Sequence, residues 1–114
     1  MGSSWAHLQT SPGPVGIAFD GANIWTANRG SGTVTKLRAS DGQLLGTFNA
    51  PIEPYGIAFD GENIWVSGNY VNVLRASDGV SLGLFSPNTD TVGVAFDGAN
   101  VWIAGQNDNG VGKL

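Results

Sequence analysis

Small and large apolar residues alternate over short stretches of the chain, and each stretch ends in a turn signal. From Gly16 to Phe19, glycine and alanine alternate with isoleucine and phenylalanine, which is typical of a strand packed on both faces. Asp20-Gly21 follows and predicts a tight hairpin, because glycine accepts a positive φ. Further strands are predicted over 23–27, 33–38 and 44–48, with a second turn at Asp41-Gly42. No helical periodicity competes with this pattern.

This pattern of four strands recurs along the chain. The segments 14–25, 54–65 and 91–102 read PVGIAFDGANIW, PYGIAFDGENIW and TVGVAFDGANVW, at offsets of 40 and then 37 residues. A second shared block, RASDG, stands at 38–42 and again at 75–79. A repeat of about 40 residues with four antiparallel strands is typical of a β-propeller blade. We therefore predict an all-β fold built from three four-stranded blades.

The repeated block Gly-Ile-Ala-Phe-Asp-Gly-x-Asn-Ile-Trp resembles the repeats of NHL-type and streptogramin-lyase-like propellers, and the resemblance covers essentially the whole chain. It implies a fold rather than an activity. The lyases of that group use a loop histidine and an acid near the propeller axis. This chain carries Asn28, Gly68 and Gly105 at the ends of the matching strands and no histidine nearby, which argues against lyase chemistry. Such regularity is also typical of consensus-designed propellers.

The boundaries of the repeat predict how a ring would close. Units 14–50 and 54–87 hold four strands each, unit 91–114 aligns only through its third strand, and residues 5–10 align with 45–50 as a fourth strand. Closed propellers usually have about four to eight blades, so three cannot close alone. We expect a homodimer that forms one six-bladed ring, in which each N-terminal strand completes the partner's last blade. The alternative is a fragment of a longer propeller.

Composition narrows the range of partners. The net charge is −4 with five Lys and Arg residues, which argues against nucleic acid and against an anionic membrane surface. There is no cysteine and no apolar run long enough to span a bilayer. The first ten residues lack the features of a signal peptide. We expect a soluble protein, and its compartment stays open.

Candidate ligand residues fall in two sets of loops on one face: those joining a blade's fourth strand to the next blade, and those joining second and third strands. Glu53 and Asp90 share one repeat position, where the first unit has Gly13. In a dimer they would place four carboxylates around the axis. Such a cluster is costly unless a cation sits among them or one carboxyl is protonated. The alternative is that both side chains point into water.

The loops after the second strands are rich in amide and carboxylate oxygens, which suit Ca²⁺ or Mg²⁺ better than Zn²⁺. Turn formation explains many of the same residues. Arg29 could bind an anionic group, and Tyr70 offers a stacking surface or a lid. The predicted ligand-binding set is Asn28, Arg29, Asn69, Tyr70, Gln106 and Asn107, and the predicted metal set is Glu53, Asp90 and Asp108.

Other conspicuous residues are interpreted as structural. The hairpin explains the turn aspartates Asp20, Asp60 and Asp97, and a blade-to-blade core explains Trp25, Trp65 and Trp102. The one histidine, His7, falls on an outer strand, far from the axis.

Three functions remain. The first is a self-assembling half-propeller whose dimer presents an axial pocket for a small ligand or a divalent cation. The second is a metal-dependent hydrolase, in outline like propeller lactonases and phosphotriesterases, with Glu53 and Asp90 as ligands. The third is an engineered assembly model with no ligand. The first needs no catalytic set, and the sequence shows none.

Overall fold

A computed structural model of the chain describes residues 10–50, 53–86, 90–105 and 110–114. Within these ranges the chain forms strands and no helix, so no helix there could cross a membrane. The strands are β1 (Pro14–Phe19), β2 (Asn23–Asn28), β3 (Thr33–Arg38), β4 (Leu44–Asn49), β5 (Ile57–Phe59), β6 (Asn63–Ser67), β7 (Val71–Arg75), β8 (Ser81–Phe85), β9 (Thr91–Phe96), β10 (Val101–Gly105) and β11 (Val111–Lys113).

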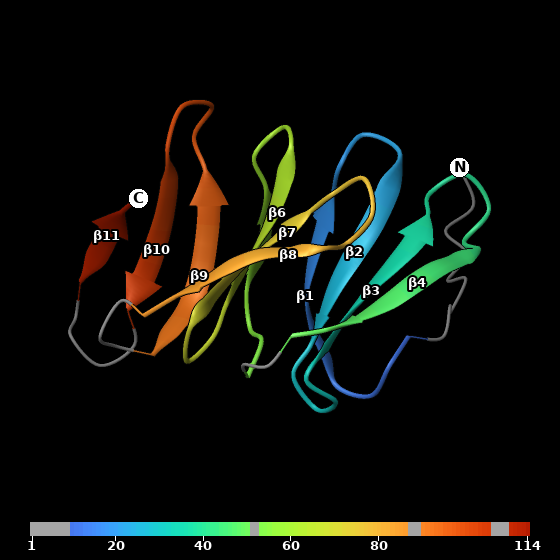
Figure 1. Cartoon of the computed structure of the whole chain (residues 1–114), viewed down its shortest axis with the longest axis horizontal. Helices are drawn as coiled ribbons and strands as arrows, with labels where there is room; N and C mark the ends of the chain where they lie inside the picture. Colours follow the sequence, from blue (N-terminus) through green and yellow to red (C-terminus); the bar gives the residue numbers. More distant parts are fainter. Residues whose placement is uncertain (1–9, 51–52, 87–89, 106–109) are drawn as a thin grey trace, which may run out of the picture.

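Each repeat unit folds into its own antiparallel sheet (Figure 1). The first sheet has the order β1-β2-β3-β4 and the second β5-β6-β7-β8, while the third has three described strands, β11-β10-β9. In the first unit the predicted strands are confirmed to within two residues, the largest difference being the start of β1 at Pro14 rather than Gly16. The strand predicted over 5–10 lies outside the described residues apart from Thr10.

The three sheets pack face to face, with β5 in contact with both β1 and β9. A repeated glycine permits this close approach. A Cβ atom added to Gly16 would lie 2.5 Å from the Tyr55 carbonyl oxygen, and one added to Gly56 would lie 3.1 Å from the Gly93 Cα atom. The small residue that alternates with isoleucine in the sequence thus marks where the next inner strand packs.

The Asp-Gly turn of each unit also holds the tryptophan of the following strand. Asp20 Oδ1 accepts the backbone N–H groups of Ala22 (3.0 Å) and Asn23 (2.7 Å), and Oδ2 accepts the indole N–H of Trp25 (2.8 Å). Gly21 has a φ of 101°. The same bonds form in the second unit at Asp60 and Trp65 and in the third unit at Asp97 and Trp102. The structural interpretation of these aspartates is confirmed, and the bond to tryptophan adds a second role.

The main core lies between the first two sheets. Trp25 is fully buried there and stacks on Phe48, with ring centroids 5.8 Å apart. The other buried residues of this cluster are Ala27, Val34, Ala50, Ile57, Ile64, Val66 and Leu74. A smaller cluster joins the second and third sheets and includes Trp65 at its edge. Trp25 and Trp65 therefore occupy the predicted blade-to-blade core, whereas Trp102 remains partly exposed within the described chain.

Candidate functional site

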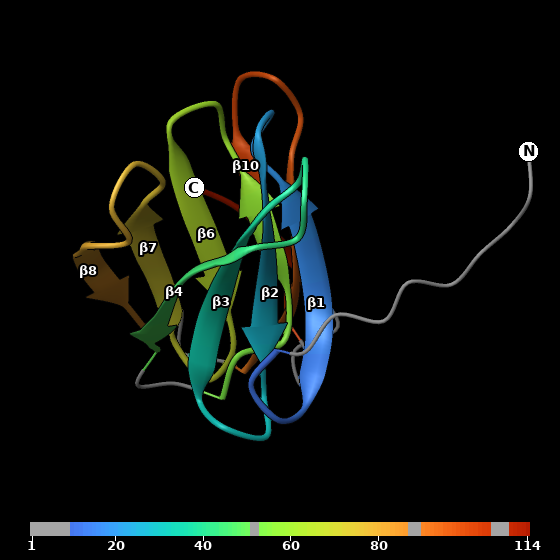
Figure 2. The same cartoon turned by 90° about the vertical axis from the view of Figure 1, so that its right-hand side faces the viewer.

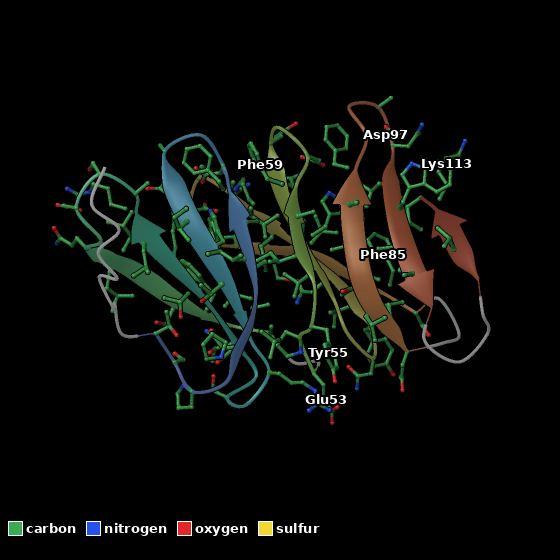
Figure 3. All side chains as sticks on the ribbon, turned by 180° about the vertical axis from the view of Figure 1, so that it is seen from behind. Glu53, Tyr55, Phe59, Phe85, Asp97 and Lys113 are labelled. Atoms are coloured by element: carbon green, nitrogen blue, oxygen red, sulfur yellow. The ribbon has the colours of Figure 1, made fainter. Side chains whose placement is uncertain are left out.

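The loops predicted to carry function lie at one end of the three sheets. The β2–β3 hairpin loop and the connection from β4 to β5 lie at the bottom of Figure 1, and the Asp-Gly turns lie at the top. Figure 3 shows the same separation in side chains: Glu53 and Tyr55 lie at one end of the molecule, and Asp97 and Lys113 lie at the other. The described residues singled out in these loops therefore share a face.

A small pocket of about 110 Å³ is present at this loop face. Side chains and backbone from all three units line it: Arg29, Glu53, Tyr55, Gly68, Asn69, Asp90 and Thr91. The structure thus brings together four residues that were predicted separately from the sequence, namely Arg29, Glu53, Asn69 and Asp90.

Arg29 connects the first unit to the second across this pocket. Its Nη2 atom lies 3.3 Å from Glu53 Oε2, and its guanidinium carbon lies 4.7 Å from the centre of the Tyr55 ring. The two charged side chains are 45% and 68% exposed. An ion pair this exposed contributes about 0–1 kcal/mol to stability. The pair is therefore available to exchange partners with a ligand at little cost to the fold.

Asn69 positions the loop that carries Glu53. Its Oδ1 atom accepts the backbone N–H of Glu53 at 3.0 Å. This bond joins two loops of the same unit through an amide oxygen of the kind that suits Ca²⁺. In this arrangement Asn69 therefore orients the Glu53 backbone.

Thr91 fixes the backbone next to Asp90. Its hydroxyl accepts the N–H of Gly68 at 2.9 Å and donates to the Gly68 carbonyl at 2.7 Å. The backbone N–H of Thr91 donates to the same carbonyl at 2.7 Å. Because Thr91 is almost fully buried, these three hydrogen bonds hold Asp90 at the pocket.

The first unit has no acid at this position for a steric reason. Gly13 adopts a φ of 78°, and a Cβ atom there would lie 2.4 Å from the backbone nitrogen of Gly30. The Gly13 carbonyl instead accepts the N–H of Arg29 at 2.8 Å. Glycine is thus required at 13, and the loop it stabilises presents Arg29 to the pocket.

The structure corrects the sequence-based interpretation of Asn28. This residue is fully buried at the end of β2. Its Oδ1 atom accepts the Thr26 hydroxyl (2.9 Å), and its Nδ2 atom donates to the Thr33 (3.2 Å) and Thr35 (2.8 Å) hydroxyls. The amide is therefore used inside the first sheet and is not presented to a ligand.

One further described residue of the predicted sets does not join the pocket. Tyr70 is exposed and is not among the residues that line it. Gln106, Asn107 and Asp108 lie outside the described residues. Among the described residues, no group of three or more histidine, cysteine or acidic side chains is close enough to hold a metal ion. Glu53 and Asp90 supply oxygens that suit Ca²⁺, but the Arg29 guanidinium competes with a cation for Glu53.

Sequence reasoning missed Tyr55 and Thr91. Tyr55 stands where the other two units have Val15 and Val92, and Thr91 stands where they have proline. A residue that departs from its own repeat is a signal visible in the sequence. In both cases the departure serves the pocket: the ring supports Arg29, and the hydroxyl fixes the backbone beside Asp90.

No protein-family model matches the chain, and no curated protein matches it. Solved structures do. Hydrazine synthase of Kuenenia stuttgartiensis matches with a TM-score of 0.78 at 21% identity, over 90% of this chain and 32% of that one. The WD40 repeats of RRP9 match with a TM-score of 0.68 at 15% identity, over 89% of this chain and 36% of that one. Virginiamycin B lyase from Staphylococcus aureus matches with a TM-score of 0.69 at 18% identity, over 89% of this chain and 40% of that one.

These likenesses show the fold. The chain is built from β-propeller repeats of the kind found in streptogramin lyase and other propeller proteins. It spans well under half the length of each of these three solved chains.

Proposed function

We propose that the chain is a self-assembling half-propeller, in which two copies close one six-bladed ring and present their loop pockets at its axis. The observation that carries the proposal is that the two outer faces of the described chain expose residues whose repeat equivalents are buried between its first and second units.

One half is the outer face of the first sheet. Figure 2 looks onto this sheet, with the other two sheets behind it. Ile17 is 70% exposed, whereas Ile57, at the same repeat position in the second unit, is 7% exposed because the first unit covers it. Val15 and Phe19, on the same face of β1, are also exposed. This face has the composition of a blade-to-blade core and no blade against it in the described chain.

The other half is the outer face of the third sheet. Trp25 is fully buried where the second sheet covers it, whereas its equivalent Trp102 is 38% exposed. The third sheet also ends at β11, whose outer edge pairs with no described strand. Exposed apolar surface and unpaired strand edges both favour association.

A second copy satisfies both faces at once. When two copies are placed head to tail, the Trp102 face of each copy meets the Ile17 face of the other. The ring then has two equivalent junctions, and no blade face is left uncovered. Two copies of three units give six blades, within the range of about four to eight that closed propellers show. Residues 5–10, which align with the fourth strand of a blade, would then pair with the partner's β11. Further blades of a longer chain would cover the same faces, so the experiment must use residues 1–114 alone.

Closure would bring two loop pockets together around the axis. Each copy contributes Glu53, Asp90 and Arg29, so four carboxylates and two guanidinium groups would face one another. We propose that this axial site takes a small polar ligand or a divalent cation such as Ca²⁺ or Mg²⁺. The metal-dependent hydrolase remains a prediction from the sequence, because no described feature of the pocket beyond the carboxylates of Glu53 and Asp90 adds a nucleophile or base to it. An engineered assembly model with no ligand would form the same ring and would differ only in leaving this axial site empty.

A charged substitution at the outer face tests the assembly. Ile17→Asp places a carboxylate in the proposed junction but alters a residue that is mostly exposed in the single chain. The matched control is Leu82→Asp, at a half-exposed position on β8 of the middle unit. Light scattering coupled to size exclusion should give a two-chain mass for the unmodified protein and the control, and should show that species lost in Ile17→Asp. A two-chain mass for Ile17→Asp, or a one-chain mass for the unmodified protein, would overturn the proposal.

A further inference from the structure

A lysine joins the first unit to the second. Lys36 Nζ donates a hydrogen bond to the carbonyl oxygen of Ala76 at 2.9 Å and lies 5.1 Å from the centre of the Trp25 ring. Ala76 belongs to the RASDG block that follows β7 and packs at the edge of the main core. The ammonium group is therefore held between an indole face of its own unit and a backbone carbonyl of the next.

The third unit carries the same lysine on its outer face. Lys113 pairs with Trp102 across β11 and β10 as Lys36 pairs with Trp25 across β3 and β2. Its Nζ atom lies 5.9 Å from the centre of the Trp102 ring, so the ammonium group is already poised over the indole. Lys113 is exposed.

The first unit carries the matching acceptor. Ala39 stands in the first RASDG block at the position that Ala76 holds in the second. A hollow opens beside it, lined by Phe19, Gly21, Ala22, Asn23, Arg38, Ala39 and Ser40. In the second unit the equivalent residues Phe59 and Ala76 pack against the cluster that contains Trp25. The first unit thus presents an uncovered version of the surface that receives Trp25 and Lys36.

We propose that Lys113 of one copy enters this hollow on a second copy and donates a hydrogen bond to the Ala39 carbonyl oxygen, while Trp102 packs against Phe19. The inference rests on the proposed assembly and names one hydrogen bond and one packing contact at its junction. It fixes both the direction and the register of the junction, because the lysine lies in the third unit and its acceptor lies in the first. It also makes assembly depend on one ammonium group at each junction, so acetylation of Lys113 would oppose closure.

The chain offers an internal control, because Lys36 and Lys113 are its two lysines. Brief acetylation with an amine-reactive reagent, read out residue by residue by mass spectrometry, compares them directly across a dilution series. Lys113 should be protected to the same degree as Lys36 at concentrations where native mass spectrometry shows two chains. On dilution Lys113 should become reactive while Lys36 remains protected. The N-terminal amine reports reagent activity in each sample.

A pair of substitutions provides a second measurement. Lys113→Met keeps an unbranched apolar side chain over Trp102 but removes the donor, and should raise the dissociation constant of the two-chain species about tenfold. Lys36→Met removes the equivalent bond within one chain and should lower the unfolding midpoint with a smaller effect on dissociation.

The outcomes separate the two claims. If two chains associate but Lys113 reacts as fast in the associated as in the dilute sample, the junction proposed here is wrong and the assembly stands. The same conclusion follows if Lys113→Met leaves dissociation unchanged. If no two-chain species forms at any concentration, the proposed assembly itself fails and the junction fails with it.

Discussion

Gly56 approaches the backbone of Gly93 so closely that a Cβ atom added to Gly56 would lie 3.1 Å from the Gly93 Cα atom and 2.7 Å from Ser67 Oγ. These two glycines hold the same position in consecutive units. The distance between neighbouring inner strands is therefore set by the absence of a side chain at this position.

Gly56→Ala should destabilise the protein by about 1–3 kcal/mol, because the added methyl group has no space between the second and third sheets. The control is Gly112→Ala on β11, where an added Cβ atom meets nothing within 4 Å. Urea unfolding followed by tryptophan fluorescence measures both. Equal midpoints for Gly56→Ala and the unmodified protein would show that the sheets are spaced by something other than this contact.

The turn aspartates should make stability fall in acid. Burial raises the pKa of Asp60, but hydrogen bonds from the N–H groups of Asn63, Trp65 and Glu62 outweigh it and leave the pKa below the ordinary 3.8. Burial likewise raises the pKa of Asp20, but hydrogen bonds led by that of the Trp25 indole outweigh it and leave the pKa below its ordinary value. In Asp97 the Trp102 indole bond lowers the pKa most. Their stabilisation is therefore complete above about pH 4 and is lost as pH falls through the depressed native pKa values.

Asp60→Asn tests this account, since it weakens three hydrogen bonds and removes the titrating group. It should lower the free energy of unfolding at neutral pH by about 1–2 kcal/mol, and should reduce the loss of stability between pH 5 and the acid range. Urea titrations at several pH values measure both effects. Glu62→Gln removes a carboxylate from the same turn and serves as the control. An unchanged acid slope in Asp60→Asn would contradict the role given to this carboxylate.

Asn28 should prove to be a structural residue. Asn28→Ala leaves the buried hydroxyls of Thr26 and Thr35 without their amide partner, at an expected cost of about 1–3 kcal/mol. Asn69→Ala, in the exposed loop of the next unit, should cost less because it removes one bond to the Glu53 backbone. Thermal unfolding measures the loss of stability in each variant, and the loss should be larger in Asn28→Ala. A larger loss of stability in Asn69→Ala than in Asn28→Ala would contradict the structural role given to Asn28.

Arg29 should control the affinity of the loop pocket for cations. Arg29→Met removes the guanidinium that pairs with Glu53 and should strengthen Ca²⁺ binding several-fold, because the carboxylate is then free to bind the ion. Glu53→Gln combined with Asp90→Asn should abolish binding in either background. Isothermal titration with Ca²⁺ measures each affinity. If Arg29→Met also binds no Ca²⁺, the pocket is not a cation site.

Local features of the fold could be predicted from the sequence, because they depend on neighbouring residues. The alternation from Gly16 to Phe19 and the Asp-Gly turns specify strands and hairpins within a few residues, and the structure places them there. The orientation of the Asn28 side chain could not be predicted because the strand predicted over 23–27 in fact ends one residue later, at Asn28. Once the strand extends to 28, a period of two places its side chain on the same face as that of Thr26, inside the sheet.

Features that depend on other units could not be predicted in the same way. Arg29 and Glu53 stand 24 residues apart, and only packing of the first unit on the second brings them together. Trp25 and Trp102 have nearly identical sequence surroundings, yet one is fully buried and the other 38% exposed. Their difference comes from the neighbouring blade, which no local pattern encodes.

Native mass spectrometry of the unmodified 114-residue chain tests the central claim most directly. We expect a species of two chains as the main form, which dissociates to single chains on dilution. A single-chain mass throughout the concentration range would contradict the half-propeller assembly and would leave the outer faces at Ile17 and Trp102 to another partner.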